Sequence, residues 1–219
     1  FVCPCGRTHH DLVPGSQGVF RRTCLCGHRL PTLLVNGKRA LPATCALCQA
    51  PLPALAQSLP TLHIPIVGGR GSGKSTFTRA ASSRPLGDKH LLHLHDVPGE
   101  VYEHTEHLVD ASFLGLARGM VLVVDPHADP KPVLDRVIDT LTELHGTAFP
   151  LAVVITKADL LPPEHHPYNG LTGPAAARQW LLDHHRVDLL NTADTHFTRV
   201  RCFVFPDDDP ATPVLWLTR

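Results

Sequence analysis

The sequence has no apolar run near the roughly 18–20 residues that span a bilayer, and it has no secretory signal pattern. It also lacks net charge, because 20 basic residues balance 20 acidic ones, so nothing indicates a broad attraction to nucleic acid or anionic membrane. Aromatic residues make up only 5%, which further disfavours a nucleic-acid binder. Hydrophobic residues reach 43%, enough for a real core. We expect a cytoplasmic protein.

The character of the sequence changes near residue 60. Residues 1–50 hold six of the seven cysteines and no long periodic helix. A stretch with three prolines, 49–60, comes next. We therefore expect a cysteine-rich module at 1–50, a stiff linker at 51–60 and a main domain at 61–219.

The main domain alternates apolar runs with helical patterns. Near-continuous apolar runs predict strands buried on both faces of a sheet, at 62–67, 90–96, 120–125, 151–156 and 200–205. Helical spacing and end signals predict helices at 74–83, 131–145, 174–185 and 187–196. This alternation predicts an α/β fold with a mostly parallel sheet flanked by helices, and ligands at the carboxyl ends of the strands.

The stretch GGRGSGKS comes after the first of these strands and has the spacing of a phosphate-binding loop. Its glycines let backbone N–H groups turn inward as an anion nest, and the next helix adds its positive end. Lys74 would reach the β- and γ-phosphates, and the Ser75 hydroxyl would bind Mg²⁺. A glycine-rich turn that binds nothing is the less favoured interpretation. The expected nucleotide contacts are Gly68, Gly69, Arg70, Gly71, Ser72, Gly73, Lys74, Ser75 and Thr76.

Two further motifs stand at strand ends. DVPGE places Asp96 where it can hold Mg²⁺ through water and Gly99 where its N–H could meet the γ-phosphate. TKAD places Asp159 where its carboxylate can accept from guanine N1–H and the exocyclic amine, a pattern that adenine lacks. Thr156 opens this motif, and the Lys157 stem can cover the base face. Either motif alone also occurs in ordinary turns, but three in this order favour a guanine-nucleotide site.

With these residues, 61–219 resembles the small, Ras-like P-loop GTPases. The resemblance implies a mostly parallel six-stranded sheet, Mg²⁺, and candidate catalytic positions at Lys74, Asp96, Gly99 and Glu100. Together with the cysteine-rich module, the linker and the final PVLWLTR, the chain also resembles bacterial double-GTPase proteins of conflict or defence gene clusters. That resemblance implies a protein partner, either another GTPase or an effector.

The sequence also departs from the family. Glu100 stands where many members have Gln, and a carboxylate there cannot donate a hydrogen bond to orient water, so we expect slow hydrolysis. Arg70 replaces a common Gly; it could crowd the γ-phosphate or act as an internal finger, and outward orientation is favoured. Only 20 residues separate Ser75 from Asp96, so the first switch is absent or its loop is missing from the chain. The base-side loop, 206–210, matches poorly, and we expect the chain to end inside the last helix.

The first six cysteines read C-x-C, C-x-C and C-x-x-C, with 18 residues between successive pairs. Close pairs beside a nucleotide motif indicate a reducing compartment and metal rather than disulfides. Structural Zn²⁺ is expected, because roughly 50 residues form a poor core unaided. The best four-thiolate set is Cys24, Cys26, Cys45 and Cys48, around a hairpin with an Asn-Gly turn at 36–37. Cys3 and Cys5 could pair with His9 or His10, with upstream residues, or with Cys24 and Cys26.

The 16 histidines show no convincing cluster. His93 and His95 alternate on a strand, and His184 and His185 point in different directions on a helix, so we interpret them as surface or satisfied core residues. Cys202 is expected to pack as a small hydrophobe. The favoured function is a guanine-nucleotide switch with a zinc-ribbon module. The alternatives are a nucleotide-locked scaffold without useful turnover, a P-loop ATPase or kinase, and a zinc-ribbon nucleic-acid binder.

Overall fold

The computed structural model describes residues 61–83, 90–96, 112–144, 147–169 and 172–219. The cysteine-rich module and the linker lie outside these residues, as do the predicted zinc ligands. The chain divides into two compact units, and residues 62–88 and 92–219 form the unit that contains the phosphate loop and the TKAD motif.

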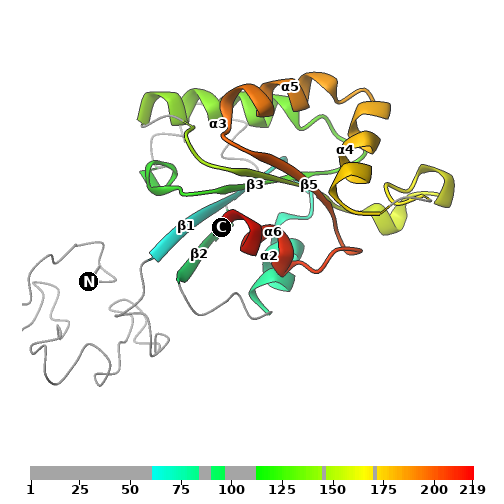
Figure 1. The fold of residues 1–219 in the computed structure, drawn as a ribbon, viewed down its shortest axis with the longest axis horizontal. Coiled ribbons are helices and arrows are strands. Elements are labelled where there is room, and N and C mark those ends of the chain that lie inside the picture. The colour runs from blue at the N-terminus through cyan, green and yellow to red at the C-terminus, as the bar shows by residue number, and fades with distance from the viewer. Residues whose placement is uncertain (1–60, 84–89, 97–111, 145–146, 170–171) are drawn as a thin grey trace, which may run out of the picture. The chain divides into compact units, whose positions relative to one another are not determined.

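Five strands form one sheet in the order β2-β1-β3-β4-β5 (Figure 1). The strands are β1 (Thr61–Val67), β2 (Leu91–Asp96), β3 (Met120–Val124), β4 (Leu151–Ile155) and β5 (Val200–Val204). The β1–β3, β3–β4 and β4–β5 pairings are parallel. The predicted strands are therefore confirmed to within a residue or so at their ends. A sixth strand is not among the described residues.

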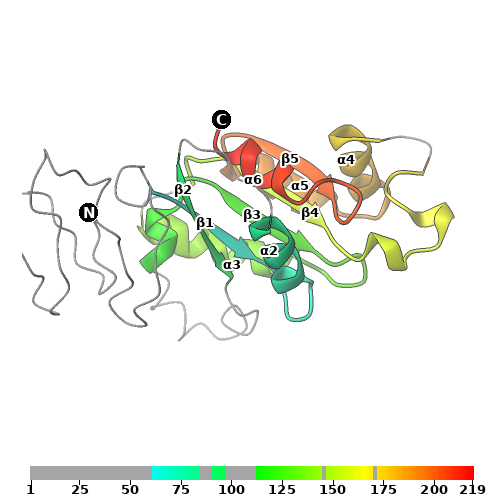
Figure 2. The same cartoon turned by 90° about the horizontal axis from the view of Figure 1, so that it is seen from below.

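Helices flank both faces of the sheet. They are α2 (Lys74–Ser82), α3 (Lys131–Leu144), α4 (Pro174–Asp183), α5 (Val187–His196) and α6 (Ala211–Leu217), and short 3₁₀ turns span Ser112–Leu116 (η3), Ala158–Leu160 (η4) and Pro163–His165 (η5). Helices α2 and α6 contact each other and lie together on one face, as Figure 2 shows, and α3 and α5 pack together on the other. The α/β class and the four predicted helices are confirmed. No described helix combines the length and the apolar character that crossing a bilayer requires.

The core consists of two layers, one on each side of the sheet. Along β3, Leu122 and Val124 belong to the layer under α3 and α5, whereas Val121 and Val123 belong to the layer under α2 and α6. Side chains alternate across a strand, so a central strand covered on both faces must be apolar at every position. This explains the unbroken apolar runs in the sequence, and all five residues of β3 and of β4 are buried.

Helix α3 shows how the sequence directs one face inward. Leu134, Val137, Ile138 and Leu141 are buried, with the three- and four-residue spacing of one helical face. The Asp129 carboxylate accepts from the Lys131 backbone N–H at 3.2 Å, which satisfies a donor at the helix start. The parallel strands leave their carboxyl ends at one edge of the sheet, and the phosphate loop and the TKAD motif both stand there.

Candidate functional site

The phosphate loop joins β1 to α2 and needs its glycines for two separate reasons. Gly71 and Gly73 have φ angles of 68° and 89°, a region that residues with a Cβ rarely adopt. A Cβ on Gly68 would lie 2.6 Å from the Val123 carbonyl oxygen, so the loop passes too close to β3 for any side chain there. Both observations agree with the spacing of the motif, which turns the chain sharply after a buried strand.

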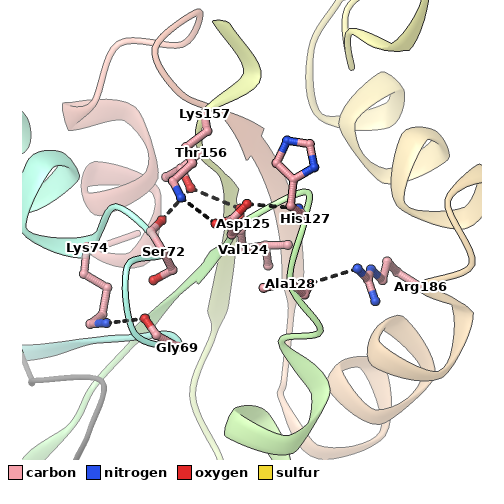
Figure 3. Close-up of polar contacts among 10 residues, drawn as sticks. All are labelled: Gly69, Ser72, Lys74, Val124, Asp125, His127, Ala128, Thr156, Lys157 and Arg186. Carbon is pink, nitrogen blue, oxygen red and sulfur yellow. Dashed lines mark hydrogen bonds and ion pairs between the residues drawn. The ribbon is translucent and has the colours of Figure 1, made fainter. Parts of the chain in front are cut away.

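Lys74 begins α2 and is buried, with 7% of its surface exposed. Its Nζ donates to the carbonyl oxygens of Gly68 at 2.8 Å and Gly69 at 2.7 Å, and Figure 3 shows the contact with Gly69. A buried ammonium requires such acceptors, because an unpaired one would cost several kcal/mol. The side chain thus lies along the loop that it would serve and holds its positive charge where phosphates would bind.

Thr156, the first residue after β4, connects the two predicted motifs. It is 2% exposed, and its Oγ1 lies 2.6 Å from the Ser72 carbonyl oxygen, 84 residues away in sequence. The same hydroxyl lies 3.1 Å from the Val124 carbonyl oxygen. A hydroxyl has one proton, so the shorter contact is the donated hydrogen bond. The phosphate loop and the TKAD motif are therefore joined directly, as Figure 3 shows.

Ser72 contributes a second buried polar group. Its residue is 3% exposed, and its Oγ has no hydrogen-bond partner among the described residues. The Ser72 hydroxyl also lies 2.8 Å from the position that a Cβ on Gly68 would take. The Ser72 hydroxyl is therefore a buried donor beside the glycine-rich loop that no described residue uses.

Lys157 forms an ion pair that the sequence did not reveal. Its Nζ donates to Asp125 at 2.6 Å, and the other Asp125 oxygen accepts from the His127 N–H at 2.9 Å. Burial raises the pKa of Asp125, but these hydrogen bonds outweigh it and hold that pKa below its ordinary value. Lys157 itself has a φ of 55°, a backbone conformation that is rare for a residue with a side chain. Asp125 directly follows the apolar strand 120–124, and this position at a strand end is the feature of the sequence that could have pointed to it.

The remaining predicted residues in the described part of the chain face solvent. Asp159 lies in η4, two residues after Lys157, and its carboxylate is exposed, so a base could reach it. Arg70, Gly71, Ser75 and Thr76 are exposed at the loop and first turn of α2, and Asp96 is exposed at the end of β2. Gly99 and Glu100 lie outside the described residues, so their catalytic roles stay predictions.

The donors available to Mg²⁺ fit a hard cation. The Ser75 hydroxyl stands at the second residue of α2, and the Asp96 carboxylate ends the strand next to β1. Both side chains are exposed, and Mg²⁺ prefers oxygen ligands and keeps several waters. These two residues would hold the ion beside the phosphates.

The base-side loop after β5 uses its acids internally. The Asp208 carboxylate accepts from the Val204 N–H at 2.8 Å and from the Tyr168 hydroxyl at 2.6 Å. Asp209 accepts from the Ala211 N–H at 2.9 Å, at the start of α6. These contacts give the PDDDP sequence a physical role: it shapes the loop and ties it to the segment after TKAD.

The prediction that the histidines form no cluster is wrong. His63 on β1 joins His93 and His95 on β2, and the possible ligand nitrogens all lie within 4.8 Å of one another. Burial and the charge of His93 lower the pKa of His63, and burial, His93 and His63 lower the pKa of His95 to about 4. The cluster is not evident in the sequence because His63 is 32 residues before His95 and meets it only through sheet order. As predicted, Cys202 is buried in the core.

No family model and no curated protein sequence matches the chain. The zinc ribbon and the membership of a conflict-system family therefore stay predictions.

Distant similarity exists to solved structures. SelB, a translation elongation factor from Methanococcus maripaludis in complex with the GTP analogue GPPNHP, is 17% identical, with a TM-score of 0.40 over 63% of this chain and 35% of that one. A bacterial selenocysteine-specific elongation factor, EF-Sec, is 14% identical, with a TM-score of 0.47 over 73% of this chain and 28% of that one. The GDP complex of an ADP-ribosylation-factor-like GTP-binding protein, the small COPII coat GTPase SAR1 from Encephalitozoon cuniculi, is 17% identical, with a TM-score of 0.43 over 73% of this chain and 79% of that one.

The chain thus spans less than two thirds of either elongation factor. At these identities and TM-scores the likeness carries no argument about activity, so a function can be proposed only from the residues of this chain.

Proposed function

We propose that residues 61–219 bind a guanine nucleotide with Mg²⁺ and hydrolyse GTP slowly, so that the bound nucleotide controls contact with a protein partner in the cytoplasm. The observation that carries this proposal is the hydrogen bond from Thr156 to the Ser72 carbonyl. It joins the phosphate loop after β1 to the base motif after β4, across the end of β3, so the phosphates and the base of one nucleotide can be held at the same edge of the sheet.

The chemistry of each end fits its part of the nucleotide. The loop presents backbone N–H groups at the start of α2, where the helix dipole favours an anion, and Lys74 adds a full positive charge. Bound Mg²⁺ would supply charge neutralisation between the β- and γ-phosphates. The exposed Asp159 carboxylate accepts hydrogen bonds only, which matches the two guanine donors and rejects adenine.

Nucleotide choice is tested by isothermal titration of the full chain with GDP, GTP, ADP and ATP. Guanine nucleotides are expected to bind and adenine nucleotides to bind far more weakly, and Lys74→Ala should abolish binding. Asp159→Asn replaces one acceptor by an amide donor, so it should lose guanosine nucleotides and gain xanthosine nucleotides, which carry an oxygen in place of the amine. Glu164→Gln is the matched control, because this exposed carboxylate lies only five residues away. Equal affinity for GDP and ADP would refute the guanine assignment.

Hydrolysis is tested separately by phosphate release under single-turnover conditions. The expected result is slow release that requires Mg²⁺ and disappears in Lys74→Ala. A chain that binds GTP but releases no more phosphate than that variant is the nucleotide-locked scaffold instead. Glu100→Gln is expected to accelerate release, because the amide can donate a hydrogen bond to water.

A further inference from the structure

Three histidines converge on one face of β1 and β2, outside the phosphate loop and the base motif. His93 and His95 are two residues apart on β2, so their side chains leave the same face of the sheet. Their ring centroids are 4.0 Å apart, and that of His63 on β1 lies 5.3 Å from His93 and 5.1 Å from His95. The pairing of β1 with β2 thus brings three imidazole rings together.

The nitrogen positions suit a metal ion. His63 Nδ1 and His95 Nε2 are 2.9 Å apart, and one nitrogen from each of the three rings lies within 4.8 Å of the others. Tetrahedral Zn²⁺ binds imidazole nitrogens at about 2.0–2.1 Å, which places two such nitrogens about 3.3 Å apart. The 2.9 Å contact is a hydrogen bond between the two rings, and no separation exceeds 4.8 Å, so ring rotations that replace this hydrogen bond by metal ligation would complete the geometry.

We propose that His63, His93 and His95 bind one divalent transition-metal ion that prefers imidazole ligands, with Zn²⁺ as the best fit. His93 is exposed and the other two rings are half-buried, so water can reach the ion and fill the remaining position. The ion would clamp β2, the terminal strand of the described sheet, onto β1. This proposal does not depend on nucleotide binding.

The position of the cluster gives the clamp a consequence. Asp96 directly follows His95, and Gly68 begins the phosphate loop five residues after His63. A metal ion would therefore restrain the two strands that lead into these positions. One feature opposes a cation: the positive charge of Arg118 acts on His63, where it contributes to the lowered pKa.

The experiment must separate this site from the six N-terminal cysteines, because thiolates can bind the same metals. The full chain, reduced and stripped of metal, is titrated with Co²⁺ as the wild type and as His93→Ala, and bound metal is counted by equilibrium dialysis with elemental analysis. The cysteines are identical in both proteins, so the difference between them isolates the histidine site. His93 is exposed, so its removal should leave the fold intact, and His127→Ala, another exposed histidine, is the matched control.

The wild type and His127→Ala are expected to bind one more Co²⁺ than His93→Ala. The difference spectrum should show cobalt d–d bands without thiolate-to-metal charge transfer. His63→Ala should lower the Co²⁺ affinity of this site at least about 100-fold. Removing a residue that only hydrogen-bonds a metal ligand costs at most about that much, so the loss of a ligand itself should cost no less. Arg118→Ala should tighten it by up to about fivefold, the scale of an exposed charge pair. Equal stoichiometry and affinity in the wild type and His93→Ala, or an equal loss in His127→Ala, would overturn the proposal.

Discussion

Replacing Thr156 by valine tests the link between the phosphate loop and the base motif. Valine has nearly the same shape, so packing is kept, but the hydrogen bond to the Ser72 carbonyl at 2.6 Å is lost. Thr156 is 2% exposed, so the abandoned carbonyl has little access to water. Leaving a buried acceptor unsatisfied costs about 1–3 kcal/mol. For a protein of this size that corresponds to a fall of about 2 to 12 °C in the thermal midpoint.

Tryptophan fluorescence is a suitable probe of this unfolding, because both tryptophans, Trp180 and Trp216, lie in the unit that contains the loop. The affinity for GDP should fall as well. If the nucleotide must restore the loop geometry, the cost of about 1–3 kcal/mol corresponds to a loss of about 5- to 150-fold in affinity.

Thr142→Val is the matched control. Thr142 is exposed on α3 and its hydroxyl bonds the Ile138 carbonyl, which the helix already supplies with a donor, so this change should stay within about 0.5 kcal/mol. The proposed link is refuted if Thr156→Val keeps the midpoint and the GDP affinity of the control.

Three further predictions concern the same region. Gly73→Ala should destabilise the protein by about 1–3 kcal/mol and weaken GDP binding, because φ is 89° there. Gly69→Ala has nothing within 4 Å of its added Cβ, so it should keep the thermal midpoint of the wild type, and thermal unfolding compares the two variants. The Asp125 ion pair should stabilise the fold above the ordinary carboxyl pKa of 3.8 and lose this effect as pH falls through the lower pKa of the folded state. The difference in free energy of unfolding between the wild type and Asp125→Asn should therefore be largest near neutral pH. An unchanged difference at pH of about 3 would contradict this prediction. Tyr168→Phe should cost about 1.5–3 kcal/mol in chemical denaturation, the range for a hydrogen bond to a charged group, because the hydroxyl donates to the Asp208 carboxylate; a cost near zero would show that water replaces the contact.

Much of the fold could be predicted because its signals are local. The buried strands β3 and β4 show themselves as apolar runs, and α3 shows itself by the spacing of Leu134, Val137, Ile138 and Leu141. The phosphate loop is also local, since its glycines and Lys74 lie within a single turn of chain. In each case the physical cause, burial or a sharp turn, acts on residues that are neighbours in sequence.

The order of residues along the chain was enough to predict the strand and helix positions and the sharp glycine turn after β1, whereas the guanine-nucleotide site stays a prediction. Three contacts became visible only in the folded chain: Thr156 holds Ser72, Lys157 pairs with Asp125, and His63 meets His93 and His95. These contacts join residues 30 or more positions apart, and they depend on the order β2-β1-β3-β4-β5 and on strand register. A periodic pattern records which face of a strand is buried, but it does not record which strand lies beside it.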